Sequence, residues 1–329
     1  MAKDFLKMTY SLPLKSAIKG SRKDLSEQAL EDIKALTGPR TKVFLWEILK
    51  TWVVILGVIA LAVHVNNIFV SIFAMFIVAT RQNVLGLLVH DQAHYTGIKN
   101  KYGDLITDFF VAYPLIILSV KNYAKVHLSH HKYFMTDKDP DLQRKSGKDW
   151  IFPMEHRQFL MIVLKDLVGM TFIENVKGKN VEDTAVSAPR LWETPKWVKP
   201  AYFLVAAAII TATHSWSIIL LYWVLPLLTF VQIIVRWGGI CEHRYIYNGT
   251  LEETTPLIIK PWWENMIMPS QNFMLHVYHH YYANISFSNL PKVHDIFVKE
   301  GLIDETAVFH GSWDYLKTLL NDRKMHRAV

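Results

Sequence analysis

Cysteine is almost absent from this chain of 329 residues, which contains only Cys241. One thiol cannot build a disulfide framework, a four-cysteine zinc site or an iron–sulfur cluster. Any metal bound by this protein must therefore be held by nitrogen and oxygen ligands.

Charged residues are also scarce, and long stretches lack them altogether. Only 20% of the residues are charged, 51% are hydrophobic, and the mean hydropathy is +0.15. This balance argues against a disordered chain and against an ordinary soluble globule. Residues 51–80 and 200–235 contain no Asp, Glu, Lys or Arg. We therefore expect an integral membrane protein.

Each charge-free run is too long for a single crossing of a bilayer. As straight helices the two runs would measure about 45 and 54 Å, whereas a hydrocarbon core is about 30 Å thick. Polar residues interrupt the runs at 64–67 and at 214–216. The sequence thus predicts an all-α integral membrane protein with four transmembrane helices in two hairpins.

Positive charges predict the orientation of these hairpins. Residues 1–50 carry ten Lys and Arg, whereas the turns at 64–67 and 214–216 carry none. By the positive-inside rule both termini are cytoplasmic. Topology then explains the formal net charge of +7, so nucleic acid is not an expected partner.

The chain is expected to form one domain, 1–329, because no repeat or linker divides it beyond the two hairpins. Its predicted segments are a cytoplasmic N-terminal segment 1–42, a first hairpin 43–90, a cytoplasmic region 91–199, a second hairpin 200–235 and a cytoplasmic region 236–329. The two later cytoplasmic regions are expected to form a helical cap.

Shorter apolar stretches are expected to lie at the membrane without crossing it. Residues 109–120 are free of charge but too few to span, which indicates a re-entrant or interfacial helix. The apolar run 159–164 is followed by Lys165 and Asp166, which is typical of an amphipathic helix on a membrane surface. Paired Trp262 and Trp263 are expected to be interfacial anchors.

Nine of the fifteen histidines follow a pattern just beyond the predicted spans. One motif, HDQAH, has the spacing HxxxH, and two motifs, HLSHH and HVYHH, share the spacing HxxHH. In a helix, residues i, i+3 and i+4 lie on one face. The nine are His90 and His94 in the first box, His127, His130 and His131 in the second, His276, His279 and His280 in the third, and the isolated His243.

Nine imidazoles on one side of a membrane indicate metal binding. They are too many for one ion and enough for two ions with four or five ligands each. Imidazole binds zinc, copper, iron and nickel, so the ligands alone do not identify the metal. Chance clustering of surface histidines is the alternative, and the repetition of the spacing at helix exits disfavours it.

These motifs resemble the three histidine boxes of the membrane fatty-acid desaturase and hydroxylase superfamily. The resemblance covers residues 40–300, and the third box followed by NLP at 289–291 is similar to the ending of bacterial acyl-lipid desaturases. It implies two iron ions that activate O2 to take hydrogen from an unactivated C–H bond. By the same resemblance all nine histidines are iron ligands, and it indicates no other catalytic residue.

Four polar residues near the boxes are expected to hold the imidazoles. Asp139 and Asp141 belong to a DPD element that resembles one in the family, Asp91 lies inside the first box, and Asn272 lies one helical turn before the third box. Hydrogen bonds to imidazole N–H groups fix the tautomer and orientation of metal ligands. A solvated polar turn is the alternative for these residues.

Departures from the family pattern narrow the expected reaction. The spacing HxxxH in the first box favours acyl-lipid, sphingolipid or hydroxylase branches, and His276 at the start of the third box disfavours front-end desaturation. No HPGG haem motif of a fused cytochrome b5 occurs, so we expect a separate ferredoxin or cytochrome b5-type electron donor with its reductase. The expected enzyme is a desaturase of lipid or acyl chains from the bilayer, in a bacterial inner membrane.

Two alternatives stay open. A di-iron hydroxylase, or a specialised desaturase of a small amino-acid-derived metabolite, would use the same site. A His-rich zinc transporter or receptor belongs to another class of protein. A transporter is expected to place ionisable residues at mid-membrane, whereas the charge-free runs contain only His64 and His214, both at the turns.

Overall fold

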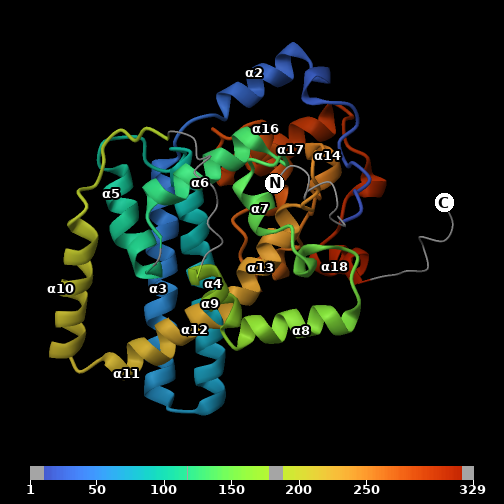
Figure 1. Ribbon diagram of the computed structural model, residues 1–329. Helices are drawn as coiled ribbons and strands as arrows, with labels where there is room; N and C mark the ends of the chain where they lie inside the picture. The colour runs from blue at the N-terminus through green and yellow to red at the C-terminus, as the bar shows by residue number, and fades with distance from the viewer. Residues whose placement is uncertain (1–10, 117, 178–187, 321–329) are drawn as a thin grey trace.

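The computed structural model describes residues 11–116, 118–177 and 188–320, and this part of the chain is built from helices without a β-strand. Its few β-bridges are isolated, such as the one between Ile18 and Ile303. Long helices stand side by side at one end, and short helices form a cap at the other (Figure 1). The predicted all-α class is confirmed.

The first hairpin consists of α3 (Thr41–Val65) and α4 (Ile68–Ala93). Asn66 ends α3 in the left-handed conformation, with a φ of 48°, and its N–H donates to the carbonyl of Ala62. The side-chain oxygen of Asn67 then accepts from the first backbone N–H groups of α4, as an N-cap does. The turn lies where the polar interruption predicts it.

Three helical segments are long and apolar enough to cross a membrane: α3, α4 and the run Trp216–Glu242. The third run contains α11 (Trp216–Ile219), the π-helical turn η5 (Leu220–Val224), α12 (Leu225–Leu228) and α13 (Phe230–Glu242). The other helix of the predicted second hairpin, α10 (Val198–Ala212), has 15 residues and measures about 22 Å. Since α10 is shorter than a hydrocarbon core, the prediction of four spans stays a prediction.

The chain between the hairpins turns back on itself. It comprises α5 (Gly103–Thr107), the π-helical turn η2 (Asp108–Ala112), η3 (Tyr113–Leu115) and, after an 88° bend, α6 (Val120–Tyr133). Trp52 of α3 and Trp223 of η5 stack with ring centroids 5.3 Å apart. Their indole N–H groups donate, at 2.8 Å each, to the carbonyls of Phe110 and Pro114. Backbone carbonyls in this segment thus have the protein partners that lipid does not offer.

Short helices from both ends and from the middle of the chain form the cap (Figure 1). They are η1 (Arg22–Asp24), α2 (Glu27–Ala35), α7 (Pro140–Arg144), η4 (Lys148–Trp150), α8 (His156–Leu167), α9 (Met170–Lys177), α14 (Leu251–Thr254), α15 (Trp262–Ile267), η6 (Phe273–Leu275), α16 (His276–Tyr281), η7 (Phe287–Asn289), α17 (Leu290–Lys299), η8 (Glu305–Ala307) and α18 (Ser312–Leu320). Buried Tyr278 and Phe297, with rings 4.9 Å apart, pack α16 against α17.

Helix α8 lies across the direction of α3 and α4 (Figure 1). Ile162 on this helix is buried, whereas Leu160 and Leu164 are 57% and 43% exposed. Trp262 and Trp263 on α15 are exposed as well. Apolar side chains presented outward on short helices suit contact with a membrane surface.

Helix α4 forms the centre of the bundle and positions the site. It contacts α3, α6, α12 and α13. The side chains of Leu85, Leu88 and Val89 in its second half are fully buried. Because its last turns are surrounded by protein, α4 presents His90 to the interior of the cap.

Candidate metal centre

Four helix ends carry the predicted ligands. His90 lies in the last turn of α4 and His94 ends that helix, while His243 ends α13. The second box lies in the last half of α6, and the third box lies in α16. The HxxHH spacing is therefore helical in both places, and each box turns its imidazoles to one side.

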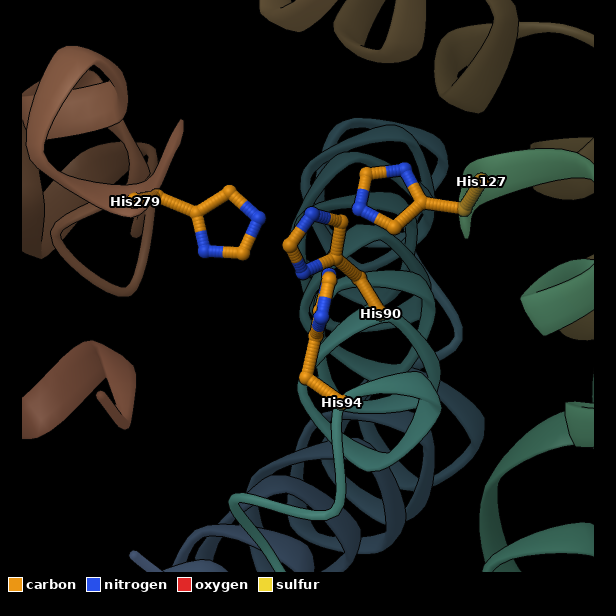
Figure 2. Close-up of side chains that lie close together, drawn as sticks. All are labelled: His90, His94, His127 and His279. Atoms are coloured by element: carbon orange, nitrogen blue, oxygen red, sulfur yellow. The ribbon is translucent and has the colours of Figure 1, made fainter. Parts of the chain in front are cut away.

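Five imidazoles form the first group. The ligand nitrogens of His90, His94, His127 and His279 all lie within 4.8 Å of one another. Figure 2 shows these four rings meeting from three segments of the chain. His131 joins them, because its Nε2 lies 3.0 Å from Nε2 of both His127 and His279. We call these residues the five-imidazole group.

The other four imidazoles form a second group. The ligand nitrogens of His130, His243 and His280 lie within 4.8 Å of one another. His276 joins them through its Nε2, which lies 3.2 Å from Nε2 of His280. We call these residues the four-imidazole group. The two groups adjoin, because the rings of His131 and His280 stack 4.3 Å apart.

The arrangement of ring nitrogens suits a cation. His130 Nδ1 lies 3.0 Å from both carboxylate oxygens of Asp139. A carboxylate only accepts hydrogen bonds, so Nδ1 carries the proton and Nε2 of His130 presents a lone pair. That lone pair lies 3.3 Å from Nε2 of His243, a contact that a cation between the two nitrogens would make favourable.

Three ring nitrogens of the five-imidazole group also lack a partner. Both ring nitrogens of His90 and Nε2 of His94 are buried and have no hydrogen-bond partner. A buried polar atom left in this way costs about 1–3 kcal/mol. Coordination to a metal ion supplies the partner, so the residues of both groups fit a dinuclear centre with nitrogen ligands.

Burial lowers the pKa of most of these imidazoles and keeps them neutral. In His94, burial and secondarily the positive charge of Arg190 lower the pKa to about 3. Burial, together with neighbouring imidazoles, holds the pKa of His243, His279 and His280 well below the ordinary value of 6.5. Since neutral imidazole is the form that binds metals, these histidines are in their ligand form at neutral pH. His130 differs, because burial lowers its pKa but the hydrogen bond to Asp139 and the negative charge of that residue outweigh burial and raise it.

Asp139 is the predicted carboxylate that contacts an imidazole. It is fully buried, and besides His130 it accepts from the backbone N–H groups of Met135 and Asp141, at 2.9 and 2.8 Å. The same carboxylate thus orients the His130 ring and caps α7. The Asp141 carboxylate pairs with Lys145 Nζ at 3.0 Å. Asp141 supports His130 only indirectly, because its backbone N–H donates to Asp139.

The other two predicted partners, Asp91 and Asn272, converge on the turn η7. Asp91 accepts from the Ser286 hydroxyl at 3.4 Å and from the Phe287 N–H at 3.3 Å. Asn272 Nδ2 donates to the Phe287 carbonyl at 3.1 Å. Both side chains therefore fix the loops beside the first and third boxes, and their contacts are made with residues other than the histidines.

Thr255 and the aromatic residues beside the site were not among the residues predicted from the sequence. Thr255 Oγ1 lies 3.0 Å from Nδ1 of His243, so this ring too is oriented by a hydrogen bond. Phe273 lies with its ring centroid 4.5 Å from that of His90, and Phe134 lies 4.9 Å from His280. A lone threonine and scattered phenylalanines carry no motif that would have identified them.

The other histidines in the described part of the chain lie outside both groups. His326 falls beyond the residues that the structure describes. His64 and His214 lie at the far turns, His156 begins α8, His310 precedes α18, and His294 Nδ1 lies 2.8 Å from the Tyr278 hydroxyl.

Two adjoining groups of imidazoles that could hold metal ions lie where α4 and α13, which belong to segments long enough to cross a membrane, end in the cap. The sequence model of the fatty acid desaturase family matches residues 66–313, and this chain belongs to that family. The family consists of oxidoreductases and is known for di-iron sites, so the chain is an enzyme of this broad class. No curated protein matches the chain. The resemblance inferred from the histidine boxes is confirmed.

Proposed function

We propose that this enzyme is an O2-dependent di-iron desaturase that introduces a C=C bond into the acyl chain of a lipid. The observation that carries the proposal is the division of nine buried or half-buried histidines into groups of five and four, where the membrane-length segments Ile68–Ala93 and Trp216–Glu242 end. Together with the family match, this arrangement supports two iron ions. Their assignment to all nine histidines is part of the proposal.

The chain's own residues would bind the metal ions, orient the imidazole ligands and enclose the site. When bound, iron supplies the redox chemistry with O2 that removes hydrogen from an unactivated C–H bond. Asp139 and Thr255 orient the rings of His130 and His243 through their Nδ1 atoms. Phe273 lies against His90 and keeps water from the ligands on that side, which favours a controlled reaction with the substrate.

The reaction requires electrons from outside the chain. Desaturation takes two hydrogen atoms from adjacent carbons, and with two further electrons and two protons O2 is reduced to two molecules of water. We propose an acidic ferredoxin or a cytochrome b5-type protein, with its reductase, as the donor. Exposed Lys125, Lys132 and Lys138 lie around the second box, and their positive charge would attract such a carrier.

A bacterial inner membrane with both chain termini in the cytoplasm is the proposed location. The ten Lys and Arg among residues 1–50 support it through the positive-inside rule. A hydroxylase, or a desaturase of a small amino-acid-derived metabolite, is the second candidate, since family membership covers desaturases and hydroxylases alike. Family membership argues against the zinc transporter or receptor.

Mass spectrometry of lipids and polar metabolites tests the proposal. Cells supplied with ferredoxin and its reductase would express the wild type, a His276→Ala/His280→Ala variant, or the control His156→Ala at the exposed start of α8. Loss of two hydrogens from an acyl chain in the wild type and the control alone supports a lipid desaturase. Gain of one oxygen supports the hydroxylase, and a change confined to polar compounds supports the metabolite enzyme.

A further inference from the structure

Arg190 is buried against the end of α4, far from it in sequence. Its side chain is 2% exposed and that of its partner Asp104 is 8% exposed. Nε and one terminal nitrogen of Arg190 each lie 2.6 Å from a different oxygen of Asp104. This parallel, two-pronged pairing is the strongest geometry between a guanidinium and a carboxylate.

The same guanidinium caps the helix that carries the first box. Its two terminal nitrogens donate to the backbone carbonyls of Ala93, at 2.9 Å, and Gln92, at 3.0 Å. The last carbonyls of a helix have no intrahelical partner, and the partial negative charge at this end favours a cation. The residue that follows these carbonyls is His94, a member of the five-imidazole group.

The residue on the other side of His94 is held by the same segment. Tyr95 has a φ of 58°, a conformation that costs free energy in a bulky residue. The Arg190 guanidinium lies over the Tyr95 ring, 3.8 Å from its centroid. The N–H of Leu191 donates to the Tyr95 hydroxyl at 2.6 Å. Arg190 and Leu191 therefore fix the backbone on both sides of His94.

Asp104 is itself fixed from within the first box. Gln92 Nε2 donates at 2.9 Å both to Asp104 and to the carbonyl of Ile98, and Gln92 Oε1 accepts from the Ile98 N–H. The pair is thus part of a buried polar network in which each charged group has several partners. A lysine has neither the fork nor the flat face that these contacts use.

We propose that Arg190 is a positioning residue that holds His94 in the five-imidazole group. The inference rests on the proposed function, namely that this group binds a metal ion. Asp139 and Thr255 act on ring nitrogens of their histidines, whereas Arg190 acts on the backbone before and after His94. Loss of Arg190 therefore weakens metal binding in the five-imidazole group and leaves the four-imidazole group intact.

Titration of the metal-depleted, full-length protein in detergent with Co²⁺ tests this inference. The wild type should bind two ions per chain. Arg190→Lys should bind one ion with wild-type affinity and the other about 10- to 100-fold more weakly, as when other supports of metal ligands are removed. Its visible spectrum at one ion per chain should match that of His94→Ala, because both variants keep the four-imidazole group.

The control is Lys121→Gln, which removes an exposed ion pair between α6 and Glu193 of the same segment. It should bind two ions with wild-type affinity. If Arg190→Lys does not fold, Tyr95→Phe replaces it: this variant keeps the ring and loses the bond to Leu191, and it should weaken the same ion several-fold. Millimolar guanidinium should restore the second ion to Arg190→Ala.

Three other outcomes would overturn the inference or the proposed function. A folded Arg190→Lys protein that binds two ions with wild-type affinity would overturn the inference and leave the proposed function standing. Equal weakening of both ions would also overturn it, because a general loss of structure would then explain the result. A wild-type protein that binds no Co²⁺ or Fe²⁺ would overturn the proposed function, and the inference with it.

Discussion

The substitution Asp139→Asn removes one negative charge from the centre of the site with almost no change of shape. Each oxygen of this fully buried carboxylate accepts twice, once from His130 Nδ1 and once from a backbone N–H, that of Met135 or that of Asp141. An amide has one oxygen. In either orientation, the NH2 group of the variant faces a backbone N–H that has lost its acceptor.

Two separate effects follow from this geometry. The lost buried hydrogen bond should lower the free energy of unfolding of the metal-free protein by about 1–3 kcal/mol. The remaining bond from His130 to a neutral oxygen is about half as strong as one to a carboxylate, so the ring is held less firmly. Changes of this kind beside metal ligands lower metal affinity by about 10- to 100-fold.

Co²⁺ titration of the depleted protein, followed by melting curves without metal, measures both effects. The loss of affinity should concern one ion of the two, because His130 belongs to the four-imidazole group. Asp137→Asn in the same acidic run is the control, since Asp137 contributes its backbone carbonyl to Gln143. If Asp139→Asn binds both ions like the wild type and melts at the same temperature, the reasoning that Asp139 holds His130 is refuted.

Three further results are expected. Thr255→Val should weaken one metal ion about tenfold, as measured by the same titration, because His243 loses the partner of its Nδ1; unchanged affinity would mean that packing alone orients the ring. Trp223→Phe should lower the free energy of unfolding by about 1–3 kcal/mol, because the Pro114 carbonyl loses its hydrogen-bond donor. Unfolding in mixed micelles measures this change. Trp262→Phe, at a 76% exposed position, is the control and should leave the free energy of unfolding almost unchanged. The metal-free protein should lose stability as the pH falls below about 6.5. Burial lowers the pKa of His243 and of the third-box histidines, so these imidazoles stay neutral in the folded protein while those of the unfolded chain take up protons. A melting temperature that is constant between about pH 7 and 5 would contradict this prediction.

The helical spacing of the boxes predicted that the imidazoles of each box face one side, but not how they divide between two groups. Neighbours His130 and His131 belong to different groups, and so do His279 and His280. Successive residues of a helix point about 100° apart, so one box can serve two centres. Which centre each residue reaches depends on how α6 and α16 cross α4, and the sequence does not record that crossing.

The sequence also predicted the transmembrane helices only in part. Charge-free runs and polar interruptions located both turns, because a turn between helices needs polar or left-handed residues such as Asn66. The turn predicted at 214–216 already divides the second run unequally, but the pattern did not predict that the longer segment continues past residue 235 to Glu242. Hydropathy reports where charge is absent and carries no information on where a helix ends. Arg190 was overlooked for a related reason, since a lone arginine in a polar stretch looks like any surface residue.

The length of α4 has a consequence for the path of the substrate. Counted from Ile68 at the far turn, His90 lies about 33 Å along the helix axis, slightly more than the thickness of a hydrocarbon core. An upright α4 with Ile68 at one edge of that core would hold the candidate iron ligands level with lipid headgroups. An acyl carbon normally resides deep among the lipid tails, so under the proposed function the enzyme must lift its substrate out of the bilayer before reaction. The tail would then exchange lipid neighbours for protein ones, and the headgroup would have to move aside into the water.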